Sequence, residues 1–391
     1  MKTSARSGLL PVGMTDTLSP FVEYETEAVS VFTDVFRMAG YQRAAPPLLE
    51  FEETLLSEKY SDLSCQTFRV TDAVSGRIMG LRADMTPQVG RIAVTRLKRE
   101  PRPLRLTYTG DVIRVFPTQL NPARQILQAG AELIGVDCAK ADAEIILLAA
   151  EALEKIGLPH FVFDLNLPTL FPALCAAYEI DREDREKTTL LLNQKDFSAA
   201  FSVLEKTNKK VRENKDLFIS LFQAFGDCDR VFDVLRSLSL PDEASAECHR
   251  LMEVVALLKR EKAGLPLTVD VFENRGFEYH CGIGFSVFSK QSGQELGRGG
   301  RYFAGIDGER SEPAVGITLF LEEILSVLKK KDDKKRVYVP FDVSFAETAA
   351  LRAKGYVTVC GLNAGGREEA RRLKCGCIYT DGQVVPLELD L

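Results

Sequence analysis

Residues 104–135 constrain the fold of this 391-residue chain more than any other stretch. The segment 105–116 is rich in Thr, Tyr, Val, Ile and Phe, which favour a pleated, half-buried strand. A short segment that contains two prolines, 117–122, follows it and predicts a loop. Residues 124–134 then alternate between polar and apolar side chains. The pattern predicts two strands joined by a loop.

The second predicted strand has one polar face. Alternation places Gln128 and Glu132 on the same side as Arg124, and small or apolar residues on the other side. Arg114 belongs to the partner strand. Such a face stabilises a sheet poorly but suits a small ligand that carries both an amine and a carboxylate. An ordinary solvated surface strand is the alternative interpretation.

The same stretch resembles motif 2 of class II aminoacyl-tRNA synthetases, specifically that of histidyl-tRNA synthetases. The run Gln-Ala-Gly-Ala-Glu at 128–132 is similar to the histidine-reading Gln-x-Gly-x-Glu of that family, and Arg114 stands fourteen residues before Gln128, as the motif 2 arginine does. Phe116 replaces a glutamate of the family, and Ile126 replaces the phenylalanine that stacks on adenine. The resemblance implies that groups that read histidine are present, whereas groups that read ATP are missing.

Residues 81–87, Leu-Arg-Ala-Asp-Met-Thr-Pro, are similar to the family's Leu-Arg-Pro-Glu-Gly-Thr, whose acid contacts the amino group of the substrate. Asp84 keeps the carboxylate with one methylene fewer, and Thr86 is unchanged. A carboxylate can accept charge-assisted hydrogen bonds from an ammonium group. The residues by themselves predict a helix start, with Thr86 as its cap and Pro87 as its first residue.

Residues 275–280, Arg-Gly-Phe-Glu-Tyr-His, resemble the Arg-Gly-Leu-Asp-Tyr-Tyr signature of histidyl-tRNA synthetases and their relatives. In that family the arginine lies beside the scissile phosphate and the tyrosines line the imidazole pocket. Arg275 and Tyr279 match, and His280 takes the place of the second tyrosine. A packed strand residue is the alternative interpretation of His280.

Residues 297–302 and 313–317, Gly-Arg-Gly-Gly-Arg-Tyr and Pro-Ala-Val-Gly-Ile, resemble motif 3, which completes the ATP site in that family. The family's arginine for the γ-phosphate is expected seven residues after Gly316, where this chain has Glu323. A carboxylate there repels a triphosphate by roughly 1–4 kcal/mol at ~4 Å. Glu323, Phe116 and Ile126 together predict a protein that forms no aminoacyl-adenylate.

The predicted fold class is α+β, a class II aminoacyl-tRNA synthetase-like antiparallel sheet flanked by helices, with a helical insertion and a small C-terminal α/β domain. The expected boundaries are 1–167 for the first part of the core with motifs 1 and 2, 168–262 for the helical insertion, 263–330 for the second part of the core, and 331–391 for the C-terminal domain. A helix followed by a strand near residue 41 is similar to motif 1, which builds the dimer interface in the synthetases.

Composition argues against several classes of function. The net charge of −6 argues against a protein that holds tRNA, because neutralising phosphates with basic side chains supplies most of such affinity. Nine cysteines without a CxxC pair and three scattered histidines predict reduced thiols, a cytoplasmic location and no metal site. No stretch approaches the ~20 apolar residues of a membrane span.

The combination of a kept histidine pocket and a lost ATP site is similar to the regulatory subunits of ATP phosphoribosyltransferase, synthetase-like proteins of bacterial histidine biosynthesis. The resemblance implies a non-catalytic chain without a cofactor. It would join a short-form catalytic subunit in a hetero-oligomer, with a homodimer inside it, for the first step of the pathway and its feedback inhibition by histidine. The alternatives are an active histidine–tRNA ligase and a histidine-sensing scaffold for another partner.

The same resemblance assigns a role to each candidate site residue. Three residues are expected at the amino group of histidine, two alternative arginines at its carboxylate, and three residues at its imidazole. These are Asp84, Thr86 and Glu132; Arg275 or Arg114; and Gln128, Tyr279 and His280, respectively.

Overall fold

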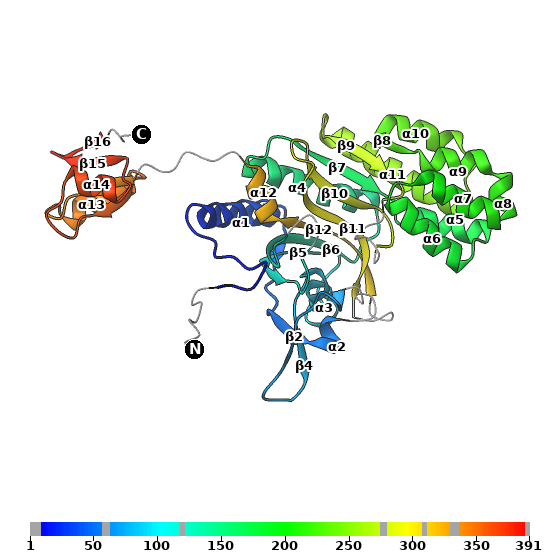
Figure 1. The fold of residues 1–391 in the computed structure, drawn as a ribbon, viewed down its shortest axis with the longest axis horizontal. Coiled ribbons are helices and arrows are strands. Elements are labelled where there is room, and N and C mark those ends of the chain that lie inside the picture. Colours follow the sequence, from blue (N-terminus) through cyan, green and yellow to red (C-terminus); the bar gives the residue numbers. More distant parts are fainter. Residues whose placement is uncertain are drawn as a thin grey trace, which may run out of the picture. The chain divides into compact units, whose positions relative to one another are not determined.

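The larger part of the chain is built around a nine-stranded sheet (Figure 1). A computed structural model describes residues 9–56, 63–117, 122–273, 280–306, 311–328 and 336–387. The chain forms two compact units, Met1–Leu328 and Lys329–Leu391. Strand order in the larger unit is β1-β5-β6-β12-β11-β10-β7-β9-β8, and neighbours are antiparallel except for the pairs β1–β5 and β7–β9. The mixed sheet and its helices confirm the predicted α+β class.

The strands of this sheet come from most of the length of the larger unit. They are β1 (Gln42–Arg43), β5 (Leu104–Ile113), β6 (Gln125–Ile134), β7 (Phe161–Asn166), β8 (Phe225–Asp227), β9 (Leu267–Asp270), β10 (Gly284–Ser289), β11 (Glu295–Gly305) and β12 (Ser311–Phe320). A separate three-stranded sheet, with the short helix α2 (Glu52–Leu55) beside it, consists of β2 (Leu49–Phe51), β4 (Ile78–Leu81) and β3 (Arg69–Thr71).

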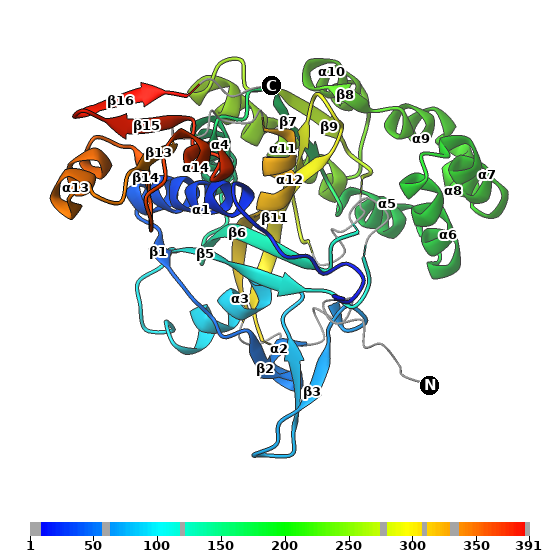
Figure 2. The ribbon, with the colours of Figure 1, turned by 60° about the vertical axis from the view of Figure 1, so that its left-hand side comes forward.

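Helices cover both faces of the nine-stranded sheet, and Figure 2 shows α1 and α3 on opposite sides of β5 and β6. On one face α1 (Phe21–Met38), α4 (Ala139–Ile156) and α12 (Leu321–Val327) bury their apolar sides against the small alternating residues of β6. On the other face α3 (Thr86–Thr95) packs with Tyr108 and Ile126 in a smaller core. The polar face of β6 therefore lies on the α3 side.

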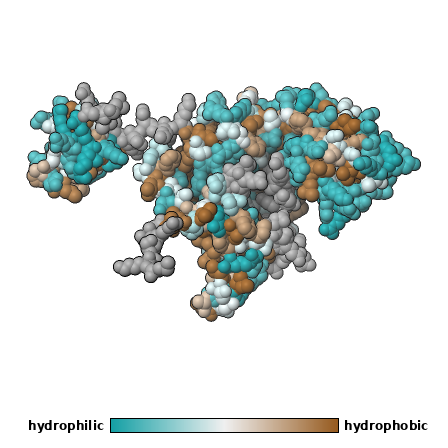
Figure 3. Space-filling model, in the orientation of Figure 1, coloured by the Kyte–Doolittle hydropathy of each residue, from teal (hydrophilic) through white to brown (hydrophobic). Residues whose placement is uncertain are grey.

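Helices α5 to α11 gather at one end of the sheet, as the green ribbons of Figure 1 show. Their outer surface is largely hydrophilic along α6 to α8 (Figure 3). A short strand between these helices, β8, pairs with β9 and thereby extends the sheet. The helices are α5 (Leu170–Tyr178), α6 (Arg182–Asn193), α7 (Phe197–Thr207), α8 (Lys209–Glu213), α9 (Lys215–Phe222), α10 (Cys228–Ser237) and α11 (Asp242–Glu261).

The smaller unit has a four-stranded sheet with one helix packed on each face. Its order is β14-β13-β15-β16, with the last strand antiparallel to its neighbour. Ser344 and Glu347 form a capping box that fixes the start of its first helix. The elements are β13 (Arg336–Val339), α13 (Phe345–Ala353), β14 (Val357–Cys360), α14 (Arg367–Arg372), β15 (Cys377–Thr380) and β16 (Gln383–Pro386).

Two local predictions from the sequence are wrong. Strand β5 ends at Ile113, so Arg114 lies just beyond it; the backbone of the next residue, Val115, donates to Gln66 O (2.9 Å) and leaves the sheet. Thr86 is the first residue of α3 and not its cap. Its hydroxyl group makes tertiary hydrogen bonds instead.

Candidate functional site

The candidate site lies on the α3 side of the sheet, where β5, β6, β12 and β11 run side by side. Glu132 of β6 is paired with Gly316 of β12. Two residues earlier, Gly130 lies between Tyr108 of β5 and Thr318 of β12. Because residues two apart project to the same face of a strand, this register brings the side chains of Glu132, Tyr108 and Thr318 together.

Glu132 is a carboxyl group surrounded by hydroxyl groups and only 1% exposed. Its Oε1 accepts hydrogen bonds from Thr86 Oγ1 and Tyr108 OH, both at 3.1 Å, and its Oε2 accepts one from Tyr302 OH at 2.8 Å. Burial raises the pKa of Glu132 to about 8, although these hydrogen bonds oppose the shift. Burial, with a further contribution from Glu132, also holds the pKa of Tyr108 well above its ordinary value.

Glycines provide the space for this arrangement. A Cβ atom on Gly316 would lie 1.7 Å from Glu132 Oε2, and one on Gly130 would lie 2.1 Å from Tyr108 Cζ. A Cβ atom on Gly300 would lie 2.5 Å from His280 Cδ2. The glycines of the predicted motifs 2 and 3 therefore let buried side chains cross directly over the sheet backbone.

Asp84 links α3 to β6. Its Oδ1 accepts a hydrogen bond from the backbone N–H of Thr86 (2.8 Å), and its Oδ2 accepts one from Gln128 Nε2 (3.1 Å). Gln128 is fully buried, and its Oε1 has no hydrogen-bond partner among the described residues. A buried acceptor without a donor is costly, so a ligand that donates an N–H there would satisfy it.

Two arginines flank the site. Arg114 is half-buried and its Nε donates to Ala83 O at 3.4 Å; burial lowers the pKa of this guanidinium, and the carboxylate of Asp84 opposes the shift. Arg298 of β11 pairs with both carboxylate oxygens of Glu295 at 2.9 and 2.6 Å. A cation beside the acidic residues suits a ligand that also carries a negative group.

The structure brings together five of the eight predicted site residues, and we name this set the Glu132 site: Asp84, Thr86, Gln128, Glu132 and His280. Thr86, Glu132 and buried His280 line one small cavity with motif 3 residues, and Gln128 joins them through Asp84. Arg114 lies at the edge of the site, where its Nε donates to the backbone oxygen of Ala83, the residue before Asp84. Arg275 and Tyr279 lie outside the described residues.

The sequence did not point to Tyr108, Tyr302 and Thr318, although all three contact the site. Tyr302 bonds Glu132 directly, and Thr318 lies 3.0 Å from the hydroxyl of Tyr108. A signal was present for Tyr302, since it ends the run 297–302 that resembles motif 3 and stands two residues after Gly300. Tyr108 and Thr318 required the register between strands that are far apart in sequence.

Three residues stand at the positions expected to bind ATP, and their surroundings differ from one another. Ile126 is buried in the core beneath α3, whereas Phe116 is 57% exposed beyond the end of β5. Glu323 lies in the first turn of α12. Within the described ranges, no group of three or more His, Cys, Asp or Glu side chains is placed to hold a metal ion, and no helix has the length and apolarity needed to cross a membrane.

Known proteins resemble this chain over most of its length. Residues 13–324 match the family model described as histidyl-tRNA synthetase. The ATP phosphoribosyltransferase regulatory subunit of Paramagnetospirillum magneticum is 45% identical over 382 residues, which cover 98% of each chain.

Two solved structures share the fold. One is an ATP phosphoribosyltransferase regulatory subunit/histidyl-tRNA synthetase from Bacillus halodurans, with a TM-score of 0.81, 22% identity, and coverage of 96% of this chain and 98% of that one. The other is a chain of the ATP phosphoribosyl transferase complex from Thermotoga maritima, with a TM-score of 0.57, 19% identity, and coverage of 76% and 97%. With its histidyl-tRNA synthetase core and a relative of this similarity over its whole length, the chain belongs to the family of ATP phosphoribosyltransferase regulatory subunits.

Proposed function

We propose that this chain acts with a separate catalytic subunit of ATP phosphoribosyltransferase and makes that enzyme responsive to histidine, which binds in the Glu132 site. The regulatory role follows from the family, whose members carry the name of a regulatory subunit. The catalytic partner is supported by the solved ATP phosphoribosyl transferase complex with the same fold. Histidine, the end product of the pathway, is the ligand that the site chemistry supports.

The choice of histidine as the ligand rests on two buried groups on the same face of β6. One is the carboxyl group of Glu132, and the other is Gln128 Oε1, which has no hydrogen-bond partner among the described residues. An amino acid presents an ammonium group, which Glu132, Asp84 and Thr86 would hold. Its imidazole presents an N–H group, which would donate to Gln128 Oε1, with His280 and Tyr279 beside the ring. The carboxylate of the ligand would face Arg114 or Arg275.

The proposal that the chain itself is not catalytic is supported by the residues at the positions that would bind ATP. Buried Ile126 offers no aromatic ring for adenine, and Glu323 replaces the cation that would neutralise a triphosphate. Loss of a cation that stabilises a transition state costs orders of magnitude in phosphoryl chemistry. We propose that the chain has kept the histidine pocket of the synthetase core and has lost its ATP pocket.

The proposal also includes the oligomeric state and the cellular location of the chain. The helix and strand that resemble motif 1, α1 and β1, suggest a homodimer within the larger complex. All nine cysteines are free thiols, which suits a reducing cytoplasm. Feedback would require only that histidine binds two states of the complex unequally, with a coupling of about 1–3 kcal/mol.

The test combines this chain with the catalytic subunit encoded in the same genome and measures phosphoribosyl transfer to ATP. We expect the pair to be active and histidine to inhibit it. Gln128→Met, which keeps the side-chain volume but removes the amide, should leave the uninhibited rate unchanged. It should weaken inhibition roughly 3- to 10-fold, because an ordinary hydrogen bond contributes about 0.5–1.5 kcal/mol.

Two results would contradict the proposal in different ways. Histidine-dependent exchange between ATP and pyrophosphate by the chain alone would identify a histidine–tRNA ligase. Binding of histidine without any effect on phosphoribosyl transfer would identify a histidine-sensing scaffold for another partner.

Gln125→Met, on the exposed end of β6, serves as the control for the Gln128→Met substitution in the same strand.

A further inference from the structure

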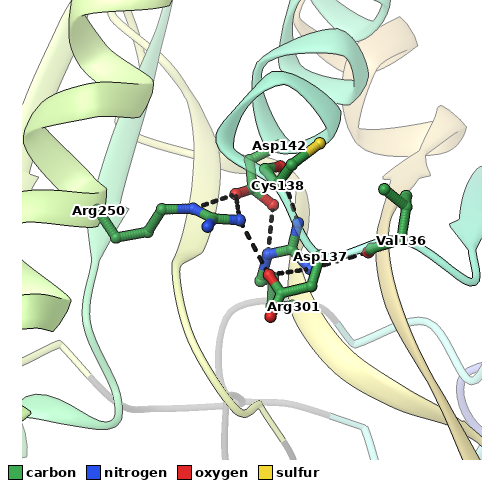
Figure 4. A network of polar contacts seen from close by, with 6 residues as sticks. All are labelled: Val136, Asp137, Cys138, Asp142, Arg250 and Arg301. Carbon is green, nitrogen blue, oxygen red and sulfur yellow. Dashed lines mark hydrogen bonds and ion pairs between the residues drawn. The ribbon is translucent and has the colours of Figure 1, made fainter.

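Figure 4 shows a buried ion-pair network around Arg301. Because Arg301 alternates with Gly300 and Tyr302 along β11, the network lies on the face of the sheet opposite the Glu132 site. Its centre is Arg301 of β11, which is 5% exposed. The Nε of Arg301 lies 2.8 Å from Asp142 Oδ1 in the first turn of α4, and its two terminal nitrogens donate to the backbone oxygens of Val136 (3.2 Å) and Cys138 (3.0 Å). Arg301 thus attaches β11 to the start of α4.

The backbone of Arg301 holds the segment that carries His280. Its carbonyl oxygen accepts from Cys281 N at 2.9 Å, and its N–H donates to Ile283 O at 2.8 Å. The residues on either side of Arg301 face the site, since Gly300 lies against His280 and Tyr302 bonds Glu132. A shift of Arg301 would therefore move both of these contacts.

A second arginine connects the network to the helices at the end of the sheet. Arg250 of α11 lies 3.2 and 3.1 Å from Asp142 Oδ2 through its Nε and Nη2, and the same Nη2 lies 3.0 Å from Asp137 Oδ1. Asp142 is 1% exposed. Two arginines therefore share one buried carboxylate, and removing either one leaves a buried charge without half of its compensation.

We propose that Arg301, Asp142 and Arg250 are positioning residues that set the affinity for histidine from behind the sheet, and that Arg250 makes this affinity depend on α11 and the helices packed around it. The inference rests on the proposed function, because it names the structural support of the same site. None of the three residues lines the cavity that contains Glu132 and His280. Their influence passes through the backbone of β11 and of residues 280–283.

The experiment compares Arg250→Gln with a matched control on the same pair of helices. Lys262, at the end of α11, binds Glu154 of α4 at 2.8 Å, twelve residues further along both segments than the contact between Arg250 and Asp142. Lys262→Gln removes a contact between the same elements but touches no residue of the network. Arg250→Lys keeps the positive charge and should retain part of the histidine affinity that Arg250→Gln loses.

Two quantities are measured on the full chain: histidine affinity by calorimetry, and amide hydrogen exchange of peptides within 280–302 without histidine. We expect Arg250→Gln to weaken histidine binding about 2- to 30-fold, the range found for substitutions in coupled networks. We also expect faster exchange around Cys281 and Arg301. Lys262→Gln should change neither quantity.

The outcomes separate this inference from the proposed function. If the natural sequence does not bind histidine, the proposed function fails together with the claim about affinity, and exchange then decides only whether the network positions residues 280–283. Unchanged exchange in Arg250→Gln, or equal effects of Arg250→Gln and Lys262→Gln, would overturn the inference. Should Arg250→Gln fail to fold, Asp137→Asn tests the same network, because this carboxylate is 64% exposed and contacts both arginines.

Discussion

Glu132 shows how strongly the fold changes the chemistry of one residue. The carboxyl group is enclosed by Thr86, Tyr108 and Tyr302, and burial raises its pKa to about 8. Near pH 7 most of the empty sites therefore hold a proton on Glu132. A bound ammonium group favours the ionised carboxylate, so ligand binding lowers this pKa and expels the proton.

We therefore expect histidine binding at pH 7 to release up to about one proton per site. Calorimetry in two buffers with different ionisation enthalpies measures the number of protons. In Glu132→Gln this release should disappear, and affinity should fall roughly 10- to 100-fold, because a hydrogen bond to a charged group contributes about 1.5–3 kcal/mol. Equal proton release from the variant would mean that another group titrates.

At the scale of single elements, periodicity in the sequence predicted which side chains share a face but not which strands meet. The alternation of β6 placed Gln128 and Glu132 together, as the structure does. Tyr108 and Thr318 were missed, because their contact depends on pairing across 210 residues of chain. The capping rule failed at Thr86 for a related reason: Glu132, which is remote in sequence, takes its hydroxyl group.

The pairing of β6 with β12 leads to a sharp prediction for Gly316. Gly316→Ala would place a methyl group 1.7 Å from the original position of Glu132 Oε2, and the partner atom belongs to a side chain held by three hydroxyl groups. We expect a loss of about 1–3 kcal/mol in stability, as for other overpacked sites, together with loss of histidine binding. Chemical denaturation and calorimetry measure the two effects.

Gly376→Ala is the control for Gly316→Ala, since a Cβ atom there meets nothing within 4 Å. This control should retain both stability and ligand affinity. A Gly316→Ala protein that binds histidine normally would show that Glu132 has room to move and that the close approach of these strands is not required.

At the scale of the whole molecule, the chain consists of two units with separate cores. The buried clusters of the smaller unit contain residues from 337–387 only. The sequence predicted an α/β domain for residues 331–391, and strands and helices alternate along this unit from β13 to β15. The sequence did not locate β8, since three residues are too few for a period to appear, and only pairing with β9 defines that strand.

Because the Glu132 site and its supporting network lie entirely within the larger unit, a chain ending at Leu328 should keep the site. We expect this shortened protein to fold and to bind histidine with an affinity within about 2-fold of the full chain, a difference of roughly 0.4 kcal/mol. Calorimetry on both proteins provides the measurement. A large loss of affinity would show that the smaller unit contributes to the site.

Three consecutive residues of β11 take part in arrangements on both faces of the sheet. Gly300 and Tyr302 face the Glu132 site, and Arg301, between them, faces the ion-pair network. A deletion of one residue from β11 would turn a guanidinium toward the hydroxyl groups and a phenol toward the start of α4. Evolution can therefore exchange side chains along this strand one at a time. A change of length by one position directly beside Gly300 would instead disrupt both arrangements in the same step.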